Sequence, residues 1–304
     1  MNKPYNEITF ITLDSVVRRC EVLDPTIAIL ITLSIIGDDL VYIALSSMIL
    51  FIHRELGIRL LSLVLISSFL NILLKYWLGV PRPNTYVVDL DYLPTVIKNV
   101  IDMLVIGKGP SLPSGHAQIS STFWLSLALS TRRVVFYACA LAIPILTSYS
   151  RVVLRMHSEV DVVVGMLIGY IISLIGYIIS TKRVGHLSRV TTYLKPTLLL
   201  ILLIVSQLLT YPDLNLITGL LIVVWVVDTF TSPVKSSTLR KVLISIISII
   251  IVGSAYLTTS SEIINYKVSR PLETIIVIVS AMIAFIVIPV KSNVFKLRYR
   301  LEMH

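Results

Sequence analysis

A short polar stretch between two apolar segments carries side chains that could do chemistry. It runs from Ser150 to Asp161 and includes Arg151 and His157. Charge is costly beside long apolar segments, so such residues usually have a purpose. If the chain is helical from about His157 onward, His157 and Asp161 lie one turn apart on one face, where the carboxylate can orient the imidazole for attack on an electrophile. The alternative is that these charges only pair with one another or meet lipid headgroups.

Basic side chains recur in a second cluster, in which Lys75 is followed by Arg82 and Pro83. If the chain brings Lys75, Arg82 and Arg151 together, the three positive charges repel unless an anion lies between them. Guanidinium and ammonium groups are the usual protein ligands of phosphate. The basic residues therefore imply a polyanionic ligand, of which phosphate is the simplest.

A third cluster, Pro113-Ser114-Gly115-His116, opens an apolar segment. Ser114 is a good N-cap residue, and Gly115 lets a ligand approach the free amides of a helix N-terminus. Such an end is a ready site for an anion. The third cluster thus predicts the same ligand as the cations.

The composition identifies the class of protein. The 304 residues are 56% hydrophobic and 14% charged, with a mean hydropathy of +0.89, whereas an ordinary soluble domain has roughly 25% charged residues. These values predict an all-α, polytopic transmembrane bundle. The net charge of +9 does not indicate nucleic acid, because the basic residues fall in short loops between apolar runs. The two cysteines show no metal-binding or redox spacing.

The apolar runs predict about nine spans, with two amphipathic or half-inserted helices at residues 6–20 and 26–36 before them. Asp38 and Asp39 suit the N-terminus of the first span. The predicted spans cover residues 39–52, 58–78, 114–130, 134–149, 160–179, 197–209, 216–230, 242–257 and 274–290. We expect a catalytic domain of about five spans over residues 1–190 and a four-helix extension of unknown role over 191–304. The long connection 79–113 is expected to cap the site.

The distribution of basic residues predicts the orientation in the membrane. Of the 26 Lys and Arg residues, fifteen fall on the side of Arg54, eight on the side of Arg82 and three near the N-terminus. The positive-inside rule places the fifteen-charge side in the cytoplasm. All three polar clusters then face the exterior of a cell membrane.

Taken together, the clusters resemble the signature of the type 2 phosphatidic acid phosphatase superfamily. That signature reads K-x6-R-P, P-S-G-H and S-R-x5-H-x3-D, and every position is filled in this order between Lys75 and Asp161. The resemblance covers about residues 1–185. The members of this superfamily include lipid phosphate and polyprenyl diphosphate phosphatases, glucose-6-phosphatases and vanadate-dependent haloperoxidases.

The resemblance implies a role for each motif residue. His157 would attack phosphorus and form a phosphohistidine, Asp161 would fix its tautomer, and His116 would be the general acid. The remaining motif residues would hold the phosphate oxygens: Lys75, Arg82, Ser114, Gly115 and Arg151. No metal and no other cofactor is expected, because fixed cations take the part of a metal ion.

The resemblance also implies a substrate. We expect an integral membrane phosphatase that acts on a lipid phosphate or diphosphate, with a polyprenyl diphosphate of undecaprenyl or dolichyl type preferred. Phosphatidic acid, phosphatidylglycerol phosphate and a soluble sugar phosphate stay open, as does a non-catalytic protein that binds or transports a lipid phosphate. Membrane lipids are the only other expected partners, and the oligomeric state stays open. Other polar residues have plainer interpretations. Asp89 and Asp91 solvate the loop, and Arg155 and Glu159 belong to a solvated helix end, with contact to lipid headgroups as the alternative. Gln207 and Asp228 form interhelical hydrogen bonds or lie near the cytoplasm, with a place in a cavity lining as the alternative.

Overall fold

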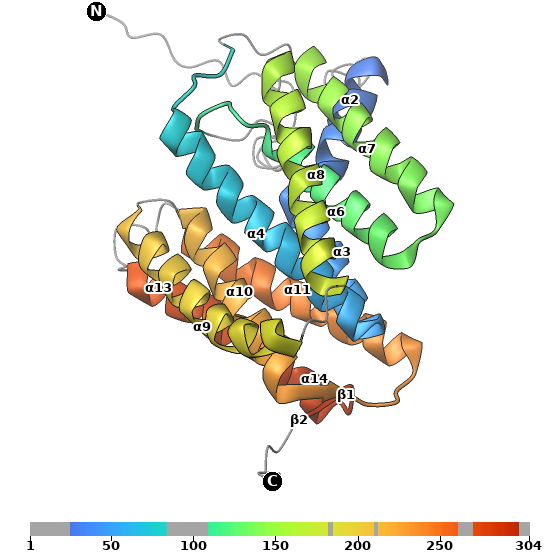
Figure 1. The fold of residues 1–304 in the computed structure, drawn as a ribbon, viewed down its shortest axis with the longest axis vertical. Coiled ribbons are helices and arrows are strands. Elements are labelled where there is room, and N and C mark those ends of the chain that lie inside the picture. Colours follow the sequence, from blue (N-terminus) through green and yellow to red (C-terminus); the bar gives the residue numbers. More distant parts are fainter. Residues whose placement is uncertain (1–24, 84–108, 182–184, 210–211, 261–269, 298–304) are drawn as a thin grey trace, which may run out of the picture.

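The computed structural model describes residues 25–83, 109–181, 185–209, 212–260 and 270–297 (Figure 1). Within these ranges the chain is helical apart from one short antiparallel pair of strands, β1 (Thr231–Pro233) and β2 (Phe295–Leu297). The predicted all-α bundle is confirmed for this part of the chain. The helix expected over residues 6–20 and the loop aspartates Asp89 and Asp91 lie outside the described residues.

The helices form two groups on either side of α4 (Figure 1). One group contains α2 (Pro25–Ile36), α3 (Asp39–Ile52), α6 (Gly115–Thr131), α7 (Val134–Val153) and α8 (Glu159–Thr181), and α4 spans Arg54–Leu78. The other contains α9 (Gly185–Leu208), α10 (Pro212–Phe230), α11 (Thr238–Ser260), α13 (Arg270–Met282), the π-helical turn η2 (Ile283–Val287) and α14 (Ile288–Lys291).

The number of membrane spans is smaller than predicted within the described residues. Four helices are long and apolar enough to cross a membrane, at Arg54–Leu78, Val134–Val153, Glu159–Thr181 and Thr274–Lys291. A fifth is present if α2 and α3, which are bent by 51°, count as one broken span. The count of nine is therefore not confirmed. The helix α9 begins at Gly185, before the apolar run expected at 197–209, and its apolar part covers Thr197–Leu208.

Helix α6 lies at the centre of its group and is polar for a buried helix. Its fully buried side chains include Gln118 and Thr122. It packs closely on α8 because Gly165 and Gly169 face it: a Cβ at Gly169 would overlap the Gln118 carbonyl oxygen. Small residues four apart allow two helices to approach in this way. The contact fixes the start of α6 beside the start of α8.

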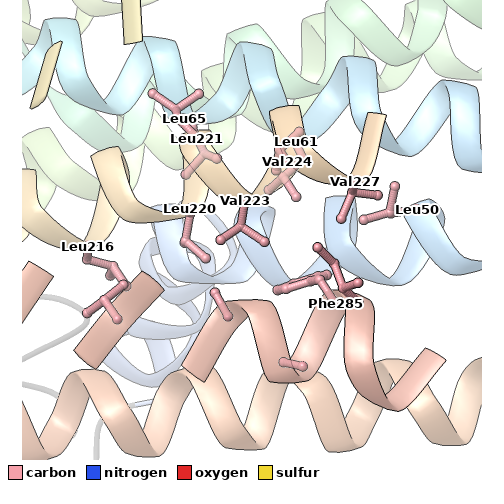
Figure 2. Close-up of a cluster of buried hydrophobic side chains, with 14 of the residues drawn as sticks. Leu50, Leu61, Leu65, Leu216, Leu220, Leu221, Val223, Val224, Val227 and Phe285 are labelled. Carbon is pink, nitrogen blue, oxygen red and sulfur yellow. The ribbon is translucent and has the colours of Figure 1, made fainter. Parts of the chain in front are cut away.

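The C-terminal helices pack against α4 through a continuous apolar cluster (Figure 2). Leu65 of α4 lies beside Leu221 of α10, and Leu61 lies beside Val224, while Leu220 and Val223 point away from α4 within the same cluster (Figure 2). At the end of this contact the Arg54 guanidinium donates to the last carbonyls of α10 and its turn, those of Val227, Asp228 and Thr231. The extension thus supports the helix that carries Lys75.

The polar Gln207 of α9 bonds to neighbouring helices. Its side-chain amide donates to Asn215 of α10 at 3.1 Å and to Thr274 of α13 at 2.9 Å. Interhelical bonds of this kind satisfy a polar group inside an apolar bundle. They favour the structural interpretation of Gln207 over a place in a binding cavity.

Candidate active site

His157 lies in the turn between α7 and α8, and Asp161 lies in the first turn of α8. Helix α8 begins at Glu159, in agreement with the span predicted from about residue 160, so His157 precedes the helix and the condition of a shared helical face is not met. The two residues still meet, because Ser158 and Asp161 form a capping box: the Ser158 amide donates to Asp161 Oδ2 at 2.7 Å, and the Asp161 amide donates to Ser158 Oγ at 3.2 Å. This box turns the carboxylate back toward the histidine.

Ser111 links the histidine and the carboxylate. His157 Nδ1 lies 3.6 Å from Asp161 Oδ2, which is too long for a hydrogen bond. The Ser111 hydroxyl donates to Asp161 Oδ2 at 2.5 Å and lies 3.1 Å from His157 Nδ1. All three side chains are buried. Ser111 belongs to no motif singled out in the sequence, and it reaches the pair only because the segment before α6 packs on the α7–α8 turn.

The imidazole of His157 is held neutral. Burial is the largest cause and lowers its pKa to about 3, against the opposing effect of Asp161. The positive charges of Arg151, Lys75 and Arg82 act in the same direction as burial. The three cations of the motifs therefore lie near enough to this histidine to affect its charge. A neutral imidazole keeps the lone pair that a nucleophile needs.

The N-terminus of α6 lies against the same turn. The Ser114 amide donates to the Asp161 carbonyl at 2.9 Å. Ser114 occupies the N-cap position as predicted, but its buried hydroxyl makes no capping bond and has no hydrogen-bond partner. A Cβ at Gly115 would lie 3.9 Å from Lys75 Nζ. The helix N-terminus thus brings together the Ser114 hydroxyl, Gly115 and the Lys75 ammonium group. This arrangement is suited to binding an anion.

A buried amide pair holds the α6 end in place. Asn71 of α4 donates to the Pro113 carbonyl at 3.2 Å and to the Gln118 side chain at 2.9 Å. Gln118 in turn donates to the Ser67 carbonyl of α4 at 2.9 Å. These bonds fix α6 relative to the end of α4 that carries Lys75, one turn after Asn71.

Arg82 approaches from the segment after α4. Its Nε donates to the Gly109 carbonyl at 2.9 Å, which joins the two ends of the 84–108 stretch. The side chains of Arg155 and Glu159 are exposed, in keeping with their interpretation as part of a solvated helix end. In the part of the chain that the structure describes, no group of three His, Cys, Asp or Glu side chains could hold a metal ion.

The break between α2 and α3 brings two further polar groups to the motif residues. Ser34 accepts a hydrogen bond from the Arg151 guanidinium at 2.7 Å, across 117 positions of sequence. Asp38 Oδ2 lies 3.8 Å from Nε2 of His116. The sequence indicated Asp38 as a helix cap, and its other oxygen does accept from the Leu40 amide at 2.9 Å. Its position beside His116 could not be read from the sequence.

The fold and the site define a multi-pass helical bundle whose polar end combines an imidazole, a carboxylate and several cations. Residues 56–184 match the family model of the PAP2 superfamily, which confirms the resemblance indicated by the three motifs. The chain is also similar to an undecaprenyl-diphosphatase of Sulfolobus acidocaldarius, with 28% identity over 172 residues, 55% of this chain and 76% of that protein. No solved structure matches the chain. These findings support a lipid phosphatase, and hence a hydrolase, with several membrane helices.

Proposed function

We propose that this protein removes a phosphate group from a lipid phosphate or diphosphate through a phosphohistidine at His157. One observation carries the proposal: a buried, neutral imidazole lies among the charges of Lys75, Arg82 and Arg151. Cations around a neutral nucleophile suit attack on a phosphate, because they neutralise the anion that would otherwise repel a lone pair.

The hydrogen bonds of His157 support Nε2 as the attacking nitrogen. The Ser111 hydroxyl gives its hydrogen to Asp161, so it can only accept from His157 Nδ1, which therefore carries the ring proton. The lone pair then lies on Nε2. In the first step Nε2 forms a bond to phosphorus while the bond from phosphorus to the leaving oxygen breaks.

The remaining motif residues complete the reaction. His116 gives a proton to the leaving oxygen and then takes one from the water that attacks the phosphohistidine, so that the nitrogen–phosphorus bond breaks and His157 returns to its neutral form. The Ser114 hydroxyl, the Gly115 amide and the three cations hold the phosphoryl oxygens. In this scheme the cations supply the charge neutralisation, and the reaction needs no metal ion.

The preferred substrate is a polyprenyl diphosphate presented at the external face of a cell membrane. The printed name of the Sulfolobus relative supports this class. The excess of basic residues on the Arg54 side supports an outward-facing site under the positive-inside rule. Phosphatidic acid and phosphatidylglycerol phosphate are the next substrates to compare.

A substrate panel with the purified, full-length protein tests the proposal. We expect phosphate release from undecaprenyl diphosphate, unchanged by EDTA, and a lower kcat/KM on phosphatidic acid and phosphatidylglycerol phosphate. A folded protein that is inactive on every lipid phosphate would refute the enzyme and favour a binding or transport protein. Loss of activity in EDTA that Mg²⁺ restores would refute the metal-independent reaction. Labelling of a cysteine placed at Ser188 from outside sealed cells would refute the orientation.

A further inference from the structure

The break between α2 and α3 is held against the helix that carries Arg151. A Cβ at Gly37 would overlap the Thr147 side chain of α7. One turn before the break, Ser34 is fully buried and accepts from Arg151. Close packing and a buried charge-assisted hydrogen bond therefore define where the break lies. The position of the residue that follows, Asp38, is set by the same contacts.

Asp38 uses its two carboxylate oxygens for different purposes. Oδ1 caps α3 through the Leu40 amide at 2.9 Å. Oδ2 lies 3.8 Å from His116 Nε2, and the residue is only 6% exposed. A helix cap needs one acceptor oxygen and no negative charge, since asparagine caps as well as aspartate. The charge of this buried carboxylate is therefore not explained by capping.

The other charged groups near the start of α6 lead to the same conclusion. Lys75 of α4 lies at the start of α6, where its ammonium group is 3.9 Å from the position of a Cβ at Gly115, and a cation there repels a positive charge on the neighbouring His116. Asp161 of α8 is the other carboxylate, but its Oδ2 accepts from Ser111 and from the Ser158 amide. Among the described residues, Asp38 is a carboxylate within ion-pair distance of His116, and its charge can offset that of Lys75.

We propose that Asp38 is the positioning partner of His116. The carboxylate orients the imidazole and stabilises its protonated form. His116 then gives its proton to the leaving oxygen as the bond from that oxygen to phosphorus breaks, and becomes neutral. This inference rests on the phosphatase reaction proposed above. It makes the α2–α3 break, which lies outside the three motifs and outside the matched residues 56–184, a part of the active site.

The substitution Asp38→Asn removes the negative charge but keeps an oxygen that can cap α3. The full-length variant keeps an acceptor for the Leu40 amide, so we expect its unfolding temperature to equal that of the wild type. We expect kcat on polyprenyl diphosphate to fall about 10- to 100-fold, the scale of general acid catalysis, with little change in KM. The alkaline limb of the pH–rate profile should move to lower pH, because the protonated imidazole has lost its anionic partner. Asp38→Glu should restore part of the rate.

Two comparisons make the test specific. With p-nitrophenyl phosphate, whose leaving group departs without a proton, the loss in Asp38→Asn should nearly vanish. Glu159→Gln removes an exposed carboxylate of α8 and should leave the rate and the profile unchanged. A wild-type kcat and pH profile in Asp38→Asn would overturn the pairing. So would an equal loss on both substrates, since a general defect in phosphate binding does not depend on the leaving group.

A readout without turnover distinguishes this inference from the proposed function. In histidine-labelled protein, NMR follows the protonation of the His116 ring directly, with a His116→Gln sample for assignment. We expect the titration midpoint of His116 to fall in Asp38→Asn and to stay unchanged in Glu159→Gln. If the wild type hydrolyses no lipid phosphate, the proposed phosphatase reaction is refuted, but a shift of the His116 midpoint in Asp38→Asn still shows that the two side chains interact. If the midpoint does not move, the pair is refuted even in an active enzyme.

Discussion

Ser111 donates its hydroxyl hydrogen to Asp161 Oδ2 at 2.5 Å, from a segment 50 positions earlier in the chain. The same hydroxyl lies 3.1 Å from Nδ1 of His157. The carboxylate therefore acts on the imidazole through a serine rather than directly. Asp161 Oδ2, which the motif implies as the partner of His157, accepts hydrogen bonds from the Ser111 hydroxyl and the Ser158 amide.

Replacing Ser111 by alanine tests this relay. Without the hydroxyl, nothing holds the hydrogen on His157 Nδ1, and Nε2 loses its defined lone pair. We expect kcat to fall about 100-fold, the scale of one lost oriented hydrogen bond in an active site. Ser111→Thr keeps the hydroxyl and should retain more activity. Steady-state kinetics with a check of the unfolding temperature decide the question, and full activity in Ser111→Ala would exclude the relay.

Replacing His157 by alanine removes the proposed nucleophile. Turnover should fall by at least about a thousandfold, as in other enzymes that lose a covalent nucleophile. Rapid acid-free quenching of the wild type with ³²P-labelled substrate should trap a labelled protein that is stable in alkali and labile in acid. The variant should trap none. Near-normal turnover in His157→Ala would rule out the covalent step.

The lowered pKa of His157 predicts the acid side of the pH profile. With a pKa of about 3 the free enzyme keeps this imidazole neutral from pH 8 down to about pH 4. An unshifted imidazole with a pKa near 6.5 would lose about 25-fold of its neutral form between pH 7 and pH 5. We expect no such loss in kcat/KM after correction for the ionisation of the substrate.

Lys75→Met provides the comparison for that profile. The variant removes one of the charges that lower the pKa of His157, so its acid limb should lie at higher pH than that of the wild type. Burial remains the largest cause, which limits the size of the change. An acid limb at pH 6.5 in the wild type would contradict the neutral, buried imidazole.

Gly169→Ala tests the packing of α6 on α8. The added methyl group would overlap the Gln118 carbonyl oxygen and lie 2.8 Å from Ser121 Cβ. Overpacking of this kind costs about 1–3 kcal/mol, and it should displace the α6 end that carries Ser114. The matched control is Gly253→Ala in α11, where the methyl group meets no atom within 4 Å. Thermal unfolding in detergent should show a lower temperature for the first variant alone.

Part of the site was predictable from residue types and spacing. The motif residues could be named because each motif is local, and the structure brings Lys75 and Arg82 of the first motif near Arg151 and His157 of the third. The capping box also had a sequence signal, Ser158 followed three residues later by Asp161. That signal predicts a helix that begins after His157, and α8 does begin at Glu159.

The number of spans was less predictable than the site. Hydropathy identifies apolar runs, but it does not tell a lipid-facing helix from one that is buried by its neighbours. Helix α6 is enclosed and rich in serine and threonine, and α2 and α3 share one bent path. The first expected span, 39–52, is the second half of that bent path. The spans expected at 197–209 and 216–230 are the apolar helices Thr197–Leu208 and Leu214–Phe230, which are shorter than the roughly 20 residues that a crossing needs.

The sequence by itself determined the all-α membrane class and the identity of the residues in the three motifs, because composition and local spacing are properties of the chain alone. Only the tertiary structure decided that Ser111 stands between His157 and Asp161, and that Ser34 and Asp38 reach Arg151 and His116. Those contacts join segments that are far apart in sequence. Their geometry depends on how closely helices pack at particular glycines, which no local pattern of residues expresses.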